Sequence, residues 1–76
     1  MITQSEKEKV SKYLKESLEE EFNKSIDELD IIKIDVLTDG SINVTTHFRF
    51  CDKEEYEQCF HISYESFCKI IKLYNI

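Results

Sequence analysis

The sequence predicts an α+β fold, a two-layer sandwich in the order α-β-β-β-α in which a three-stranded antiparallel meander carries both helices on one face. Residues 31–50 indicate the first strand pair, because apolar and polar side chains alternate on both sides of Asp39-Gly40, a common hairpin turn. The segments at the two ends of the chain instead have apolar residues at every third or fourth position, which is the helical period. One apolar sheet face and two apolar helix stripes bury each other best in two layers.

The first helix is predicted from residue 3 to about residue 24. Its start carries two overlapping capping-box signals, of which the first pairs Thr3 with Glu6. Residues 25–28 repeat this spacing and predict a short extra helical turn before the first strand begins at Ile31. One apolar stripe is expected to face the sheet, formed by Val10, Tyr13, Leu14, Leu18 and Phe22.

The register of the first hairpin follows from the need to keep its apolar side chains on one face. A two-residue loop at Asp39-Gly40 would set Ile34 opposite Thr45 and mix the two faces. A three-residue loop over residues 38–40 avoids this, and it gives Gly40 the left-handed position that such a loop requires. The predicted cross-strand pairs are Val36 with Ile42, Ile34 with Val44, and Ile32 with Thr46.

A third strand follows a polar turn over residues 51–55. Apolar residues alternate with polar ones after this turn, which again predicts a strand with one buried face. The predicted pairs of this second hairpin are Phe50 with Tyr56, Thr46 with Phe60, Val44 with Ile62 and, on the opposite face, Arg49 with Glu57.

A second helix is predicted from Ser63 or Ser66, either of which can cap it, to about Tyr74. Lys69 and Lys72 lie in its last turns, where the helix dipole favours cations. Its buried stripe consists of Phe67, Ile70, Ile71 and Tyr74.

Length and composition limit what the chain can be. At 76 residues it is predicted to form a single domain, residues 1–76. The net charge of −6, from 16 acidic and 10 basic residues, disfavours nucleic acid as a direct ligand. No apolar run approaches the roughly 20 residues that span a bilayer, so no membrane partner is expected. Three cysteines without a CxxC pair and a polar N-terminus predict reduced thiols, no signal peptide and a cytoplasmic location.

The acidic residues are concentrated in two segments. Residues 16–30 hold seven acids and one base, and residues 52–57 hold four acids and one lysine. The meander is expected to bring both segments to one end of the domain, which Lys69 and Lys72 also approach. Acids in the last turns of the first helix oppose its dipole, so helix stability does not explain them and they predict a binding surface. The candidate partner-binding residues are Glu19, Glu20, Glu21, Asp27, Glu28, Asp30, Asp52, Glu54 and Glu55.

Two other groupings of reactive side chains are weaker candidates. His47, Cys59 and His61 are predicted on the outer sheet face, with His47 opposite Cys59, and Cys51 lies further along. Nitrogen and sulfur ligands suit zinc, but structural zinc sites use short ligand spacings within turns, so no metal is predicted. A Cys–His pair here would lack a third orienting group and a pocket. No catalytic residue, cofactor or enzymatic activity is therefore predicted.

In layout and charge the chain resembles small phage-encoded anti-defence proteins, and anti-CRISPR proteins in particular. The resemblance covers the whole chain and is carried by the helix–meander–helix order and by the acids within residues 19–21, 27–30 and 52–55. In several such families, acidic side chains occupy a basic nucleic-acid groove of the target. The resemblance therefore implies a stoichiometric inhibitor without a cofactor, a nucleic-acid mimic that blocks a nucleic-acid-handling defence enzyme such as a CRISPR effector.

A second hypothesis is a homodimeric interaction module, or an immunity- or antitoxin-type protein, that uses the exposed sheet face. The acidic end would then only confer solubility. The interface would consist of Ile31, Leu37, His47, Cys59 and His61, all predicted on the outer face.

Overall fold

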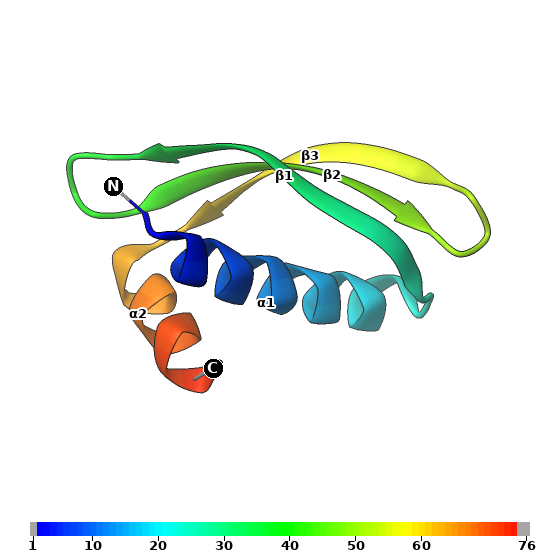
Figure 1. Ribbon diagram of the computed structural model, residues 1–76, viewed down its shortest axis with the longest axis horizontal. Coiled ribbons are helices and arrows are strands. Elements are labelled where there is room, and N and C mark those ends of the chain that lie inside the picture. Colours follow the sequence, from blue (N-terminus) through cyan, green and yellow to red (C-terminus); the bar gives the residue numbers. More distant parts are fainter. Residues whose placement is uncertain (1, 75–76) are drawn as a thin grey trace.

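The computed structural model describes residues 2–74 and confirms the predicted fold class. The helices are α1 (Gln4–Phe22) and α2 (Tyr64–Leu73), and the strands are β1 (Ile26–Val36), β2 (Ile42–Phe50) and β3 (Glu55–Ile62). The strands form one antiparallel sheet in the order β1-β2-β3, and both helices lie on the same side of it (Figure 1). Neither helix among residues 2–74 contains an apolar stretch that could span a bilayer.

α1 begins at the predicted capping box. Thr3 Oγ1 accepts a hydrogen bond from the Glu6 amide (3.1 Å), and Glu6 Oε1 accepts one from the Thr3 amide (2.9 Å). The helix ends at Phe22 because Asn23 adopts the left-handed conformation, with φ of 53°. The extra helical turn predicted for residues 25–28 is wrong, since the chain enters β1 at Ile26.

The first hairpin has the predicted three-residue loop. The Leu37 amide donates to the Ser41 carbonyl (2.8 Å), and the Gly40 amide donates to the Leu37 carbonyl (3.0 Å). Gly40 has φ of 88°, a left-handed conformation that glycine adopts without a steric penalty. Two predicted cross-strand pairs are confirmed, Val36 with Ile42 and Ile34 with Val44.

A β-bulge at Ile32 makes the third predicted pair wrong, since Thr46 lies opposite Ile31 instead of Ile32. Without the bulge, alternation along β1 would direct Asp30 into the core and Leu29 to solvent. The extra residue reverses the phase, so Leu29 and Ile31 pack against the core while Asp30 stays on the outer face. Ile32 is left 57 % exposed as a consequence. Ile31 therefore belongs to the inner face, contrary to prediction.

A second bulge, at Asp27, reverses the alternation of side chains again at the start of β1. The pairing shifts between Ile26 and Glu28, so that Ile26 lies opposite Phe50 and is buried. Asp27, the extra residue, remains exposed on the side of Arg49. The two bulges thus keep the acids of β1 out of the core and direct them to the surface.

The second hairpin has a register two residues away from the predicted one. The Phe50 amide donates to the Glu54 carbonyl (2.9 Å) across a three-residue loop, in which Lys53 has φ of 73° and takes the place that Gly40 has in the first hairpin. Arg49 consequently lies opposite Glu55 and not Glu57. A shift of two residues leaves every side chain on its original face, so alternation alone cannot distinguish the two registers.

The core between the sheet and the helices contains two apolar clusters separated by Thr46 on β2. Thr46 is fully buried, and its hydroxyl has no hydrogen-bond partner among the described residues. One cluster contains Val10, Leu14, Ile42, Val44, Ile62 and Ile70, and the other contains Leu18, Ile26, Phe48 and Phe50.

α2 packs against α1 and lies away from the β2–β3 turn (Figure 1). Ser63 caps it, because Ser63 Oγ accepts a hydrogen bond from the Ser66 amide (3.2 Å). At the other end, the Tyr74 hydroxyl donates to the Glu16 carboxylate, which raises the pKa of Tyr74 to about 12. Lys69 and Lys72 belong to this helix, so the prediction that they approach the β2–β3 turn is wrong.

Candidate protein-binding surface

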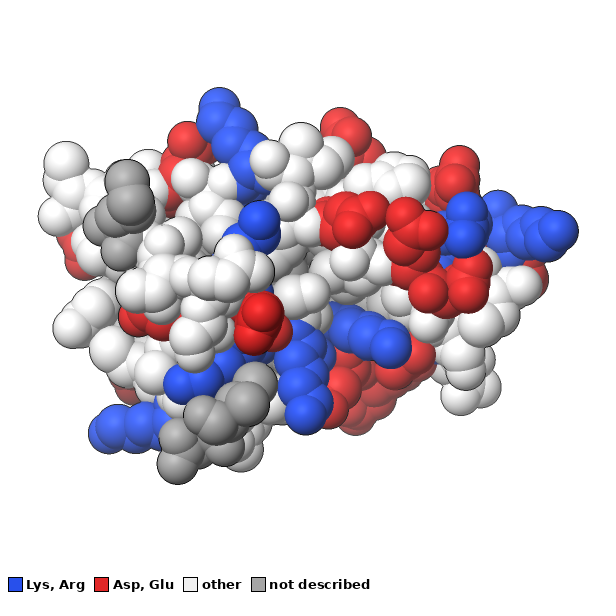
Figure 2. All heavy atoms as spheres, in the orientation of Figure 1, with Lys and Arg blue, Asp and Glu red and all other residues white. Residues whose placement is uncertain are grey.

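The end of α1, the start of β1 and the β2–β3 turn meet at one end of the molecule (Figure 1). The Cys51 amide donates to the Ser25 carbonyl (2.9 Å), which ties the α1–β1 connection to the turn. Figure 2 shows acidic side chains gathered over this half of the visible face, with basic side chains among them. We call this region the acidic end, and its acids are Glu19, Glu20, Glu21, Asp27, Glu28, Asp30, Asp52, Glu54, Glu55 and Glu57.

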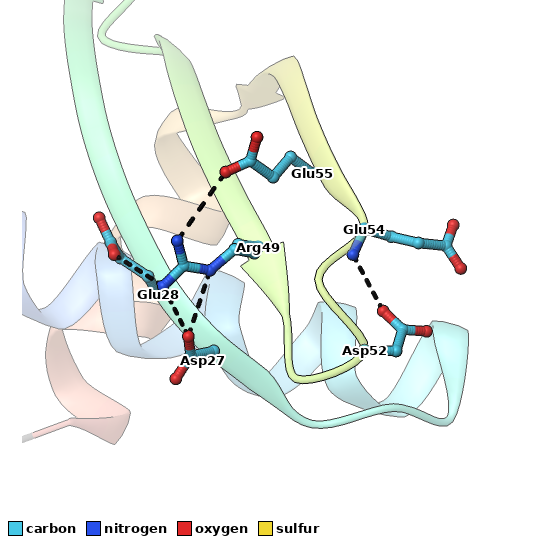
Figure 3. Close-up of polar contacts among 6 residues, drawn as sticks. All are labelled: Asp27, Glu28, Arg49, Asp52, Glu54 and Glu55. Atoms are coloured by element: carbon cyan, nitrogen blue, oxygen red, sulfur yellow. Dashed lines mark hydrogen bonds and ion pairs between the residues drawn. The ribbon is translucent and has the colours of Figure 1, made fainter.

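Arg49 organises three of these acids on the outer sheet face. Its Nη2 donates to Asp27 Oδ2 (2.7 Å) and lies 3.3 Å from Glu28 Oε2, while its Nη1 lies 3.9 Å from Glu55 Oε1 (Figure 3). The hydrogen bond to Asp27, followed by the charge of Asp27, raises the pKa of Arg49 above its ordinary value. One guanidinium on the central strand therefore fixes acids from both edge strands, and this group of four keeps two negative charges.

Lys24 holds the two acids of the β2–β3 turn. Its Nζ lies 2.8 Å from Asp52 Oδ2 and 2.6 Å from Glu54 Oε1. Hydrogen bonds from Lys24 lower the pKa of both carboxyl groups, and the Tyr56 hydroxyl, which donates to Glu54 Oε2 (2.6 Å), lowers that of Glu54 further. Figure 3 shows Asp52 and Glu54 pointing away from Arg49, so the turn acids form a separate group.

Glu19 has a structural role at the acidic end. Its Oε2 accepts a hydrogen bond from the amide of Ile26 (2.8 Å), the first residue of β1. An edge amide that would otherwise lack a protein partner is thereby satisfied, and β1 is attached to the last turns of α1. We therefore assign Glu19 to the support of the surface.

Apart from Glu19, which binds a backbone amide, four acids of this region have no basic partner. Among residues 2–74, no lysine or arginine forms an ion pair with Glu20, Glu21, Asp30 or Glu57. α1 has no basic residue in its last turn, so the dipole of the helix also opposes Glu20 and Glu21. Glu57 was not among the predicted site residues. It lies opposite His47 on β2, and Asp30 lies opposite the same histidine on β1. This row of three residues across the sheet exists only in the observed β3 register, which differs from the predicted one.

His47, Cys59 and His61 lie on the outer sheet face as predicted, but the predicted pair of His47 with Cys59 is wrong. Thr45, and not His47, lies opposite Cys59, and the ring of His61 is within hydrogen-bond distance of Asn43 (Nδ1 to Oδ1, 2.9 Å). In the described part of the chain, no group of three or more histidine, cysteine or acidic side chains is arranged to hold a metal ion.

The chain matches no protein-family model, no curated protein and no solved structure with which it was compared.

Proposed function

We propose that this chain is a small acidic inhibitor that binds another protein, and that its acidic end occupies the basic groove of a nucleic-acid-handling defence enzyme such as a CRISPR effector. The proposal rests on one observation: four carboxylates without a basic partner lie beside five that are fixed by Lys24 and Arg49. A row of carboxylates presents negative charge to lysine and arginine side chains much as a phosphate backbone does.

The paired acids support this proposal through their fixed positions. Asp27, Glu28 and Glu55 around Arg49, and the two turn acids around Lys24, have less rotamer freedom to lose when a partner binds. Both groups keep a net negative charge, so they still attract a basic surface. The pairing therefore favours a rigid acidic surface over a loose acidic tail.

The unpaired acids support the proposal because the fold does not need them. Glu20 and Glu21 are exposed and oppose the dipole of α1, and Asp30 and Glu57 are exposed on edge strands. Local stability would favour neutral or basic residues at the end of the helix. Charge of this kind raises the association rate with a basic partner, and its contribution falls as salt increases.

The experiment is capture of partners on the immobilised chain, using purified CRISPR effectors and other nucleic-acid-handling enzymes, with duplex DNA and guide RNA as competitors. We expect a captured enzyme to be released by its own nucleic acid, and to bind the Glu20→Lys/Glu21→Lys variant at least about tenfold more weakly, a loss of roughly 1.4 kcal/mol.

The matched control is Glu8→Lys/Glu65→Lys, which makes the same change in net charge on exposed acids outside the acidic end. This control should retain binding. Equal losses in the two variants would show that only total charge matters, and binding that nucleic acid does not displace would rule out occupation of the groove.

A further inference from the structure

We propose that two copies of this chain pair through β3, edge to edge and antiparallel, and so join their three-stranded sheets into one continuous sheet. The inference does not depend on the proposed inhibitory function. The two edge strands differ in how well they are protected against pairing with another chain. β1 is interrupted by bulges at Asp27 and Ile32, a device that hinders pairing with another chain, whereas β3 pairs with β2 from Glu55 to Ile62 without any shift.

The backbone of β3 has hydrogen-bonding groups free for a partner strand. The Phe50 amide bonds to the Glu54 carbonyl, and hydrogen-bonded pairs recur at every second residue of an antiparallel ladder. The even-numbered residues of β3 therefore bond to β2, and the odd-numbered ones direct their N–H and C=O groups to the free edge. Residues 55–59 and His61 are exposed, so these groups are accessible.

The side chains of β3 give its edge limited protection. The strand has no lysine, proline or inward-pointing charge, and its two charged residues, Glu55 and Glu57, lie on the outer face. Its inner-face residues include Tyr56 and Phe60, and α1 does not cover them fully. A groove of about 380 Å³ lies between α1 and β3 and is lined by Leu14, Leu18 and Phe60, among others. An adjacent strand would extend this apolar face.

Charge complementarity indicates that the strand pairing with the β3 edge belongs to a second copy of this chain, and that the two β3 strands run antiparallel. Antiparallel pairing lays the acidic end of each copy beside the α2 end of the other. Residues outside 16–30 and 52–57 hold five acids and eight bases, of which Arg49 lies at the acidic end. The remaining seven bases still exceed the five acids, so the rest of the molecule is less acidic. Parallel pairing would bring the two acidic ends together, where like charges repel.

The proposed register meets the same requirement. With Cys59 opposite Cys59 at the two-fold axis, Glu57 lies opposite His61 of the second copy, and no glutamate faces another glutamate. On the inner face, Tyr56 then lies opposite Ile62 of the second copy, which joins two large side chains. Both acidic ends remain exposed, at opposite edges of the contact.

The first measurement is the solution mass of the full chain by light scattering across a concentration series. We expect the mass to approach twice 9.1 kDa at high concentration. A mass that stays at 9.1 kDa at the highest soluble concentration would overturn the proposal and leave the β3 edge for a strand of a different protein.

The second measurement uses Cys59→Lys, which sets two ammonium groups opposite each other at the axis. The dimer Kd should rise about tenfold or more. Thr45→Lys is the matched control, because Thr45 is the neighbour of Cys59 on the same face but lies on the central strand. Thr45→Lys should still form dimers, and a dimer that persists in Cys59→Lys would place the interface elsewhere.

The third measurement needs no charged variant and works even if Cys59→Lys fails to fold. Opposed residues of a hydrogen-bonded pair have Cα atoms about 5.5 Å apart, within reach of a disulfide. Mild oxidation should cross-link a chain that keeps only Cys59 (Cys51→Ser/Cys68→Ser). A chain that keeps only Cys51 should stay uncross-linked, because its two Cys51 residues lie at opposite ends. Equal cross-linking of both chains would contradict the proposed pairing.

Discussion

Arg49 and Asp27 form a two-point contact across the start of the sheet: Asp27 Oδ2 accepts hydrogen bonds from Arg49 Nε at 3.2 Å and from Nη2 at 2.7 Å. Asp27 is the extra residue of a β-bulge, so the bulge that removes this acid from the core also delivers it to the guanidinium. The contact therefore connects the folding of β1 with the formation of the acidic end.

This relationship predicts the behaviour of Arg49→Gln. Removal of the guanidinium leaves Asp27, Glu28 and Glu55 close together without a cation, so repulsion among them should lower the urea concentration at the midpoint of unfolding. Because these groups are partly exposed, the difference from wild type should shrink in high salt. Lys33→Gln removes an exposed contact to Asp35 at 3.6 Å and should have little effect. A loss for Arg49→Gln that is unchanged by salt would contradict this account.

Thr46→Val should stabilise the protein by about 1 kcal/mol, because the substitution removes a buried hydroxyl without a hydrogen-bond partner and keeps the side-chain shape. Urea or thermal unfolding measures the change. Thr45→Val, one residue earlier on the outer face, should stay within about 0.5 kcal/mol of wild type. A destabilised Thr46→Val variant would show that the hydroxyl has a partner in solution, such as a bound water.

The third residues of the two hairpin loops should respond oppositely to substitution. Gly40→Ala should destabilise the protein by about 1–2 kcal/mol, since a residue with a Cβ is strained at φ of 88°. Lys53→Gly should stabilise it by about 0.5 kcal/mol, because relief of strain at φ of 73° exceeds the entropy cost of glycine.

A double mutant separates backbone strain from crowding at the first loop. A Cβ on residue 40 would lie 2.9 Å from Cδ1 of Tyr64. If the strain is in the backbone, Tyr64→Ala will not restore the stability that Gly40→Ala loses. Full rescue by Tyr64→Ala would assign the loss to the side-chain contact instead.

The ion pairs of Lys24 with Asp52 and Glu54 should make the stability of the protein depend on pH. Lys24 lowers the pKa of Asp52 and Glu54 in the folded state below their ordinary values of 3.8 and 4.5. A group with a lowered folded pKa stabilises the protein above its unfolded pKa, and that contribution disappears as pH falls through the folded value. The free energy of unfolding should therefore differ most between wild type and Lys24→Gln near neutral pH.

Below the folded pKa values of the two carboxyl groups, the wild-type and Lys24→Gln curves should converge. Unfolding by urea at a series of pH values measures both curves. A constant difference between them at all pH values would mean that Lys24 stabilises the fold by packing on the Phe50 ring, 5.3 Å from its Nζ, and not by its ion pairs.

Some features of the candidate surface could be predicted from the sequence and others could not. That the two acidic segments would meet could be predicted, because a meander returns β2 to the end of α1. Lys24 and Arg49 pair with five of the nine predicted acids. These ion pairs could not be predicted, because they depend on register and on side-chain geometry. Glu57 was missed for the same reason.

The sequence by itself determined those features that depend on neighbouring residues: the capping box at Thr3, the loop with Gly40 in the left-handed position and the apolar faces of α1 and β2. Tertiary structure decided between the strand registers that local sequence patterns do not distinguish. The β3 register could shift by two residues without moving a side chain to the other face, and the bulges at Asp27 and Ile32 became favourable only once β2 offered Phe48 and Phe50 as buried partners. Packing against those rings outweighs the cost of the irregular backbone, and it thereby sets where the acids of β1 lie.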